Sequence, residues 1–161
     1  MAITCMPKYP FFLFGILEPG LLSWGYVAGW LDPFTFYRDQ VPNNPVDDMP
    51  PQGLILTLMT VNLFGVMIMA GLMSCWSMHK DIAKKYTIIM IITDVGHTYS
   101  VWRGVGADYF WDPTQWNAHN VLNIGMCMFL LVHRIIFMFD GFGPLLDEKD
   151  LAKRDLAKKT A

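Results

Sequence analysis

Long apolar runs alternate with short polar connectors along this chain. Four runs are long enough to cross a hydrocarbon core of about 30 Å, which takes about 20 apolar residues in a helix. They are Pro10–Leu31, Gly53–Met78, Tyr86–Trp102 and Asn117–Phe139. The pattern predicts an all-α protein, an integral membrane four-helix bundle over residues 1–143, followed by a charged cytosolic tail over residues 144–161.

The composition agrees with a membrane domain. Of the 161 residues, 53% are hydrophobic and 16% are charged, whereas about a quarter are charged in soluble domains. The net charge of −2 and the absence of a basic patch argue against nucleic-acid binding. Three scattered cysteines, Cys5, Cys75 and Cys127, are too few for a disulfide framework or a zinc cluster. The first apolar run is too long for a signal-peptide core, so we expect it to be retained.

Lysine and arginine residues are distributed unequally between the two sides of the predicted membrane. Nine flank the side that carries both termini, and two, Arg38 and Arg103, flank the other side. This excess places the termini and the loop after the second run in the cytosol. The last four residues, KKTA, match the dilysine signal that retrieves membrane proteins to the endoplasmic reticulum. Because such a signal works only on a cytosolic tail, the orientation and the localisation agree.

Ionisable residues inside the apolar runs are the main indication of function. Inserting one ionisable side chain at the middle of the bilayer costs roughly 2.5–3.5 kcal/mol on insertion scales, so a functional role is the default hypothesis for each. These residues are Glu18, Asp94, His97 and Arg134, and asparagines at positions Asn62, Asn117, Asn120 and Asn123 join them.

Helical spacing indicates which of these side chains can meet. Asp94, His97 and Thr98 share one face of the third helix, and Asn123 shares a face of the fourth helix with Arg134. We therefore expect the polar groups of all four helices to line one interior cavity. The aromatic residues assigned to the same site are Trp24, Tyr99 and Trp116.

Structural roles are the alternative explanation of the same residues. Asparagines in membrane helices often only link neighbouring helices, and Asn117 can cap the fourth helix. Arg134 either reaches the cytosolic head groups or pairs with Glu18. Glu18 precedes Pro19, which frees a backbone carbonyl that needs a polar neighbour. The role of His119 stays open.

Two carboxyl groups in unlike surroundings favour acid–base chemistry. A carboxylic acid in an apolar pocket can remain protonated at neutral pH and act as a general acid. Asp94 with His97 is the predicted acid, and Glu18, held by Arg134, is the predicted ionised partner; the reverse assignment remains open. A di-metal site requires Glu-x-x-His pairs on two helices, and only one Asp-x-x-His is present. We therefore expect neither a metal nor a cofactor.

Three segments resemble a family of small four-span fungal membrane proteins. They are Glu18-Pro19, DVGHTYS (94–100), and WNAHNVLNIG (116–125) followed by Arg134. That family includes terpene cyclases of the ascochlorin and ascofuranone type and related epoxide hydrolases of aurovertin-type polyene-pyrone pathways. The resemblance implies epoxide opening by protonation in the endoplasmic-reticulum membrane. It carries over site roles to Glu18, Asp94, His97, Asn117 and Arg134. An acidic residue is expected near Asn120 and is missing, which weakens the assignment of the base.

The leading hypothesis is a membrane terpene cyclase that opens an epoxide on a prenylated (meroterpenoid) substrate without a cofactor. An epoxide hydrolase acting on a polyene epoxide and a sterol-type isomerase are the enzymatic alternatives. The non-enzymatic alternative is a protein that binds lipid or sterol. In each case the expected partners are a hydrophobic small molecule and membrane lipid.

Overall fold

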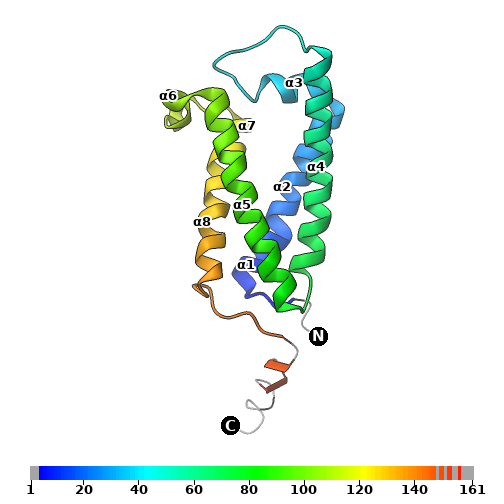
Figure 1. Ribbon diagram of the computed structural model, residues 1–161, viewed down its shortest axis with the longest axis vertical. Coiled ribbons are helices and arrows are strands. Elements are labelled where there is room, and N and C mark those ends of the chain that lie inside the picture. Colours follow the sequence, from blue (N-terminus) through cyan, green and yellow to red (C-terminus); the bar gives the residue numbers. More distant parts are fainter. Residues whose placement is uncertain (1–3, 148, 151, 154–155, 157–161) are drawn as a thin grey trace.

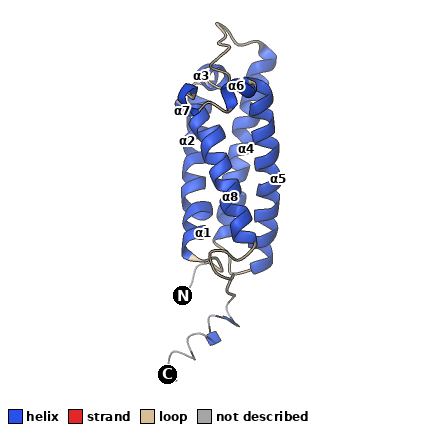
Figure 2. Ribbon diagram, turned by 90° about the vertical axis from the view of Figure 1, so that its left-hand side faces the viewer, coloured by secondary structure: helices blue, strands red, loops and turns tan. Residues whose placement is uncertain are grey.

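Helices make up the regular structure of this chain, as the apolar runs predict (Figures 1 and 2). The computed structural model describes residues 4–147, 149–150, 152–153 and 156. Within these ranges there is no strand. The elements are α1 (Lys8–Phe12), η1 (Leu13–Leu17), α2 (Glu18–Leu31), α3 (Pro33–Arg38), α4 (Pro51–Cys75), α5 (Lys80–Val105), α6 (Ala107–Phe110), η2 (Pro113–Gln115), α7 (Ala118–Asn120), η3 (Val121–Met126) and α8 (Cys127–Met138).

Local sequence explains where the long helices begin and end. Pro33 and Pro51 stand at first helical positions, where the missing N–H costs nothing. Asp32 caps α3, since its carboxylate accepts a hydrogen bond from the Thr35 amide at 3.0 Å. That amide holds the pKa of the Asp32 carboxyl below its usual range. Gly106 ends α5 with φ +84°, a conformation that favours glycine.

Three helical segments are long and apolar enough to cross a membrane: Lys8–Leu31, Pro51–Cys75 and Ala118–Met138. Helix α5, which contains the predicted third span, has 26 residues but is not among the three. Lysines occupy its first turns, and Asp94 and His97 interrupt its apolar sequence. The all-helical prediction is confirmed, whereas composition supports three of the four predicted spans.

The long helices associate in two pairs, α2 with α4 and α5 with α8. Figure 1 shows α4 and α5 close together at the end that carries the chain termini, here called the terminal end, and farther apart toward α3 and α6, the far end. An apolar cluster that includes Phe14, Cys75, Tyr86 and Phe137 joins the pairs. A smaller cluster around Phe110 and other residues of α5, α6 and η3 packs separately.

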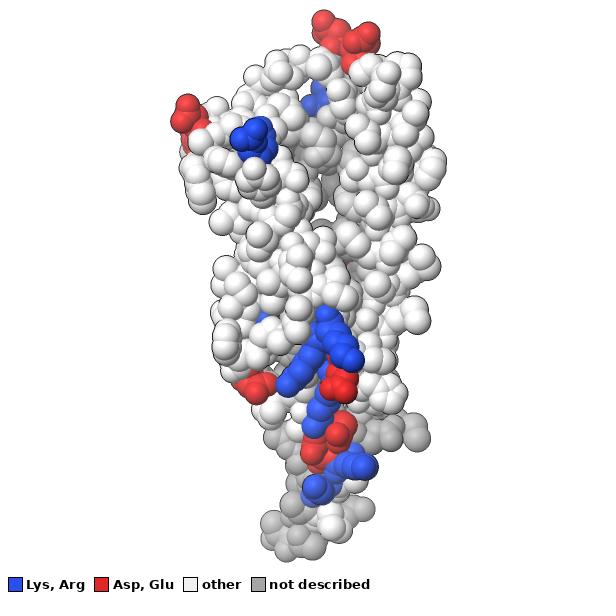
Figure 3. All heavy atoms as spheres, in the orientation of Figure 1, with Lys and Arg blue, Asp and Glu red and all other residues white. Residues whose placement is uncertain are grey.

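The two ends of the molecule carry most of its charge. Figure 3 shows lysine and arginine side chains gathered at the terminal end and an uncharged band across the middle of that face. Past α8, Leu145 is buried, and the Leu146 amide donates to the Cys5 carbonyl at 2.9 Å. Lys80 contacts both Asp147 and Asp150. The predicted KKTA signal, residues 158–161, lies outside the described residues.

Candidate functional site

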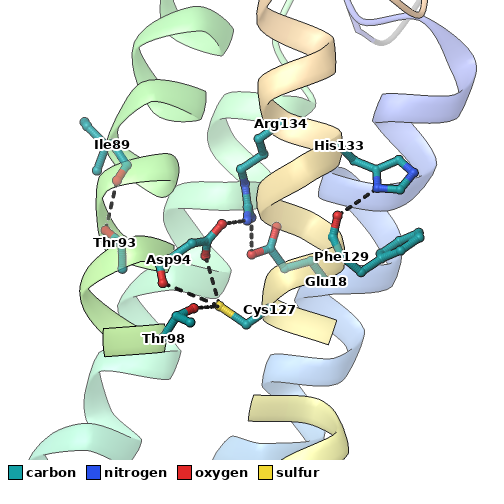
Figure 4. Close-up of polar contacts among 9 residues, drawn as sticks. All are labelled: Glu18, Ile89, Thr93, Asp94, Thr98, Cys127, Phe129, His133 and Arg134. Carbon is teal, nitrogen blue, oxygen red and sulfur yellow. Dashed lines mark hydrogen bonds and ion pairs between the residues drawn. The ribbon is translucent and has the colours of Figure 1, made fainter. Parts of the chain in front are cut away.

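Three buried charged residues from three helices meet inside the molecule (Figure 4). Arg134 of α8 donates through Nη2 to Glu18 Oε1 and through Nη1 to Asp94 Oδ2. Their exposed fractions are 1% for Arg134, 5% for Glu18 and 6% for Asp94. The predicted pairing of Arg134 with Glu18 is confirmed, and Asp94 joins it. We call these three residues the ion cluster.

Glu18 follows a helix segment whose hydrogen bonding is altered. Pro19 has no N–H, so the Gly15 carbonyl four residues earlier lacks its usual helical partner. The Trp76 indole donates to that carbonyl at 2.9 Å. The carbonyl freed by Pro19 is therefore satisfied by Trp76 and does not explain why position 18 is a carboxylate.

Two of the three helical stretches that carry the ion cluster contain a π-helical segment. One is η1, directly before Glu18, and the other is η3, directly before Cys127. Such segments are rare and frequently occur at functional sites. Their position changes the direction in which the following side chains project, and both of the following side chains belong to the site.

The remaining oxygens of the two carboxyl groups differ in their surroundings. Cys127 Sγ lies 3.8 Å from Asp94 Oδ1 and 3.5 Å from Thr98 Oγ1. Glu18 Oε2 is buried and has no hydrogen-bond partner among the described residues. The guanidinium also lies over the Phe14 ring, 5.2 Å from its centroid. One cation thus faces two carboxyl groups, and the ion cluster is neutral when one carboxyl group carries a proton.

A cavity of about 400 Å³ separates the two helix pairs and reaches the ion cluster. Glu18, Asp94 and Cys127 line it toward the terminal end, whereas His97, His119 and Asn123 line it toward the far end. Most of its other walls are apolar, including the rings of Trp24, Phe36 and Phe64. Its size is within the range of small-molecule pockets, about 300–1,000 Å³.

The predicted assembly of Asp94 with His97 is not formed, although both side chains line the cavity. Asp94 contacts Arg134 and Cys127 instead. No hydrogen bond joins Asp94 to His97 in the described part of the chain. A spacing of three residues puts two side chains on one helix face, but the guanidinium from α8 attracts the carboxylate more strongly than a neutral imidazole does.

Two predicted site residues, Asn62 and Tyr99, lie on the outer surface and do not line the cavity. Asn62 is exposed on the outer surface of α4. Tyr99 is 58% exposed and packs against Trp102, with ring centroids 5.8 Å apart. Both predictions assumed that polar groups in apolar helices face inward. In contrast, Trp24 lines the cavity while 58% of it is exposed.

Three further predicted residues support the far end without lining the cavity. Asn117 caps α7 by accepting from the Asn120 amide at 2.8 Å, and its Nδ2 donates to the Asp39 carbonyl at 3.0 Å. Asn120 is fully buried, and its Nδ2 lies 3.3 Å from the Tyr109 hydroxyl. Trp116 donates to the Tyr109 carbonyl at 3.2 Å. The capping role considered for Asn117 is therefore present.

The site includes two side chains that were not among the predicted site residues. Cys127 touches Asp94, and the only signal in the sequence is its shared helix face with Asn123 and Arg134. His119 lines the cavity with its ring edge-on to Phe36, at a centroid distance of 4.9 Å. The sequence did not predict this position of His119, because its neighbour Phe36 comes from the connector after the first apolar run. Among the described residues, no group of three His, Cys, Asp or Glu side chains could hold a metal ion.

Residues 3–144 match a protein family described as a domain of unknown function (DUF7704), and the chain belongs to that family. No curated protein and no solved structure matches it.

Proposed function

We propose that this DUF7704 protein is an integral membrane enzyme that opens an epoxide on a prenylated, hydrophobic substrate by general-acid catalysis and directs cyclisation of the resulting cation. The observation that carries the proposal is the ion cluster at the wall of a largely apolar cavity. The resemblance to the small fungal membrane cyclases, in Glu18-Pro19 and residues 94–100, supports the same reaction.

Stability alone is a poor explanation of the ion cluster. Desolvating three charged groups is expensive, and replacing buried ion pairs by apolar residues is often neutral or stabilising. Simple helix association would be served by small or singly polar residues. A buried carboxyl group beside an apolar cavity is, in contrast, what a general acid requires.

Glu18 is the proton donor in this proposal. Its Oε2 has no protein partner among the described residues, so it is free to present a proton to a substrate oxygen. Asp94 has Arg134 on one oxygen and the Cys127 thiol near the other, an arrangement that favours its ionised form. These contacts support the reverse of the assignment preferred from the sequence.

The proposed reaction balances without a co-reactant. Glu18 transfers its proton to the epoxide oxygen, the adjacent C–O bond breaks, and an alcohol and a carbocation form. An internal alkene then donates its π electrons to the cation, which closes a ring and moves the positive charge onward. Loss of a proton from the final cation to the Glu18 carboxylate restores the acid, so the product is an isomer of the substrate.

The cavity walls suit a cationic intermediate. The rings of Trp24, Phe36 and Phe64 line the space, and aromatic faces attract cations. The ionised Asp94 adds a fixed negative charge. Because most of the lining is apolar, ring closure is favoured over capture by water, and this favours a cyclase over an epoxide hydrolase.

The proposal includes four spans with both termini in the cytosol. Lysine and arginine side chains gather at the terminal end (Figure 3), and cytosolic sides of membrane proteins carry such an excess of positive residues. Helix α5 then crosses with Asp94 and His97 turned toward the cavity. The proposal places these spans in the endoplasmic-reticulum membrane.

Product analysis tests this function. Microsomes from a host that expresses the protein would be fed an epoxyfarnesyl phenol and a polyene epoxide, beside Glu18→Gln and a Thr60→Ala control. Thr60 lies on the exposed face of α4, where its hydroxyl donates to the Leu56 carbonyl at 2.9 Å. We expect cyclic alcohols from wild type and control, and none from Glu18→Gln.

Other products would replace the proposal in a defined way. Diols would indicate an epoxide hydrolase, and a shifted double bond without a ring would indicate an isomerase. Unchanged substrates, together with a co-purified lipid or sterol, would indicate a binding protein.

A further inference from the structure

We propose that the cavity takes an elongated substrate with an uncharged oxygen head group, and that His119 recognises this head group at the end opposite the ion cluster. The inference rests on the proposed function for what happens at Glu18. It adds which end of the substrate lies where and which head groups are excluded.

Two residues that line the cavity each carry a buried polar atom without a partner. Glu18 Oε2 belongs to the ion cluster, and His119 Nε2 belongs to α7; neither has a hydrogen-bond partner among the described residues. Leaving a buried polar atom without a partner is unfavourable. Because both residues line the same cavity, one bound molecule with an oxygen at each end would satisfy both atoms.

The two atoms lie at different levels of the bundle. Cys127, which contacts Asp94, marks the level of the ion cluster. His119 precedes Cys127 by eight residues, which is roughly 12 Å along a helix. The two polar groups of the ligand are therefore separated by a long apolar middle, and this middle lies along the apolar walls between α2 and η3.

The position of His119 is fixed by its neighbours. Its ring stands edge-on to Phe36, with an interplanar angle of 89°, and Phe36 is only 8% exposed. A neutral imidazole can donate or accept one hydrogen bond at Nε2, depending on its tautomer. Asn123, on the adjacent turn, donates through Nδ2 to Gln40 Oε1 at 3.0 Å, whereas His119 Nε2 has no hydrogen-bond partner among the described residues.

The charges at the far end select against an anionic head group. Asp32 and Asp39 line this end of the cavity, and no lysine or arginine is among the described lining residues. Arg38 pairs with Asp39 at 3.1 Å, whereas the Asp32 carboxylate is held by the Thr35 amide. A diphosphate would meet these carboxylates with no lysine or arginine among the described lining residues, so a phenol, hydroxyl or carbonyl group fits and a prenyl diphosphate does not.

Binding of unreactive probes tests this inference separately from catalysis. Farnesylphenol and farnesylbenzene carry the same chain, differ by one hydroxyl group and contain no epoxide. Isothermal titration of the full-length protein in detergent would compare wild type with His119→Phe, which keeps a ring against Phe36, and with Thr60→Ala as control. Thermal melting would verify that each variant is folded.

We expect wild type and Thr60→Ala to bind farnesylphenol about three- to tenfold more tightly than farnesylbenzene, the equivalent of one hydrogen bond. His119→Phe should remove this difference and leave farnesylbenzene binding unchanged. Farnesyl diphosphate should bind more weakly than farnesylphenol.

Three results would overturn the inference: equal binding of the two neutral probes to wild type, the same loss for both probes in His119→Phe, or tightest binding of the diphosphate. If the protein shows this head-group selectivity but opens no epoxide, the proposed function fails and the inference stands. The inference fails alone if epoxides are opened without that selectivity.

Discussion

At the scale of single residues, Trp76 completes the helix that Pro19 interrupts. Trp76→Phe keeps an aromatic ring but removes the indole N–H, which leaves the Gly15 carbonyl unpartnered. We expect a loss of about 1–3 kcal/mol in stability, measured as a lower melting temperature in detergent. Trp111→Phe is the matched control because Trp111 is 68% exposed. Equal melting temperatures for the two variants would contradict the role of Trp76.

The ion cluster predicts an asymmetry among its own variants. Arg134→Met leaves two carboxyl groups facing each other without a cation, and breaking a buried ion pair on one side costs about 3–5 kcal/mol. Glu18→Gln leaves the Arg134–Asp94 pair intact and should cost much less. Thermal melting of both variants measures the difference. If Glu18→Gln were the more destabilised variant, the assigned pairing would be wrong.

The sequence contained part of this residue-level arrangement. The pairing of Glu18 with Arg134 follows from two unlike charges buried in apolar runs. The contact of Asp94 with the same guanidinium does not, because spacing along α5 gives a direction around that helix and no information about the opposite helix. For the same reason, the sequence could not predict that Asn62 and Tyr99 point outward.

At the scale of elements, close approach of α2 and α4 is set by small residues. A Cβ built on Gly29 would lie 2.3 Å from Val61 Cγ2, whereas one on Gly20 would meet nothing within 4 Å. Gly29→Ala should therefore separate the helices and cost about 1–3 kcal/mol. Gly20→Ala, in the same helix, should be neutral or slightly stabilising, since alanine favours helix. The melting temperatures of the two variants test this prediction. If Gly29→Ala melted at the wild-type temperature, the helices would not be tightly packed at Gly29.

The apolar pattern predicted the long helices better than their irregularities. Each apolar run contains a helix, because the backbone N–H and C=O groups of a long apolar segment find their partners within a helix. The segments η1 and η3 gave no comparable signal, since a π-helical turn depends on how neighbouring helices pack. The short connector helix α3, which brings Phe36 to His119, was likewise missed because its partner lies 83 residues away.

At the scale of the whole molecule, two helix pairs meet at the terminal end and enclose a cavity toward the far end. This arrangement makes the proposed orientation testable. A glycosylation acceptor inserted in the connector between α3 and α4 should be modified in microsomes, because that loop is expected in the lumen. An acceptor added after residue 161 should remain unmodified. The opposite result would reverse the proposed topology.

The central claim is that Glu18 delivers the proton that opens the epoxide. The most direct test is the initial rate of epoxide consumption by purified wild type and Glu18→Gln, in preparations with the same melting temperature. General-acid catalysis predicts a loss of about 100- to 10,000-fold. A rate within a few-fold of wild type would show that the ion cluster only holds the helices together.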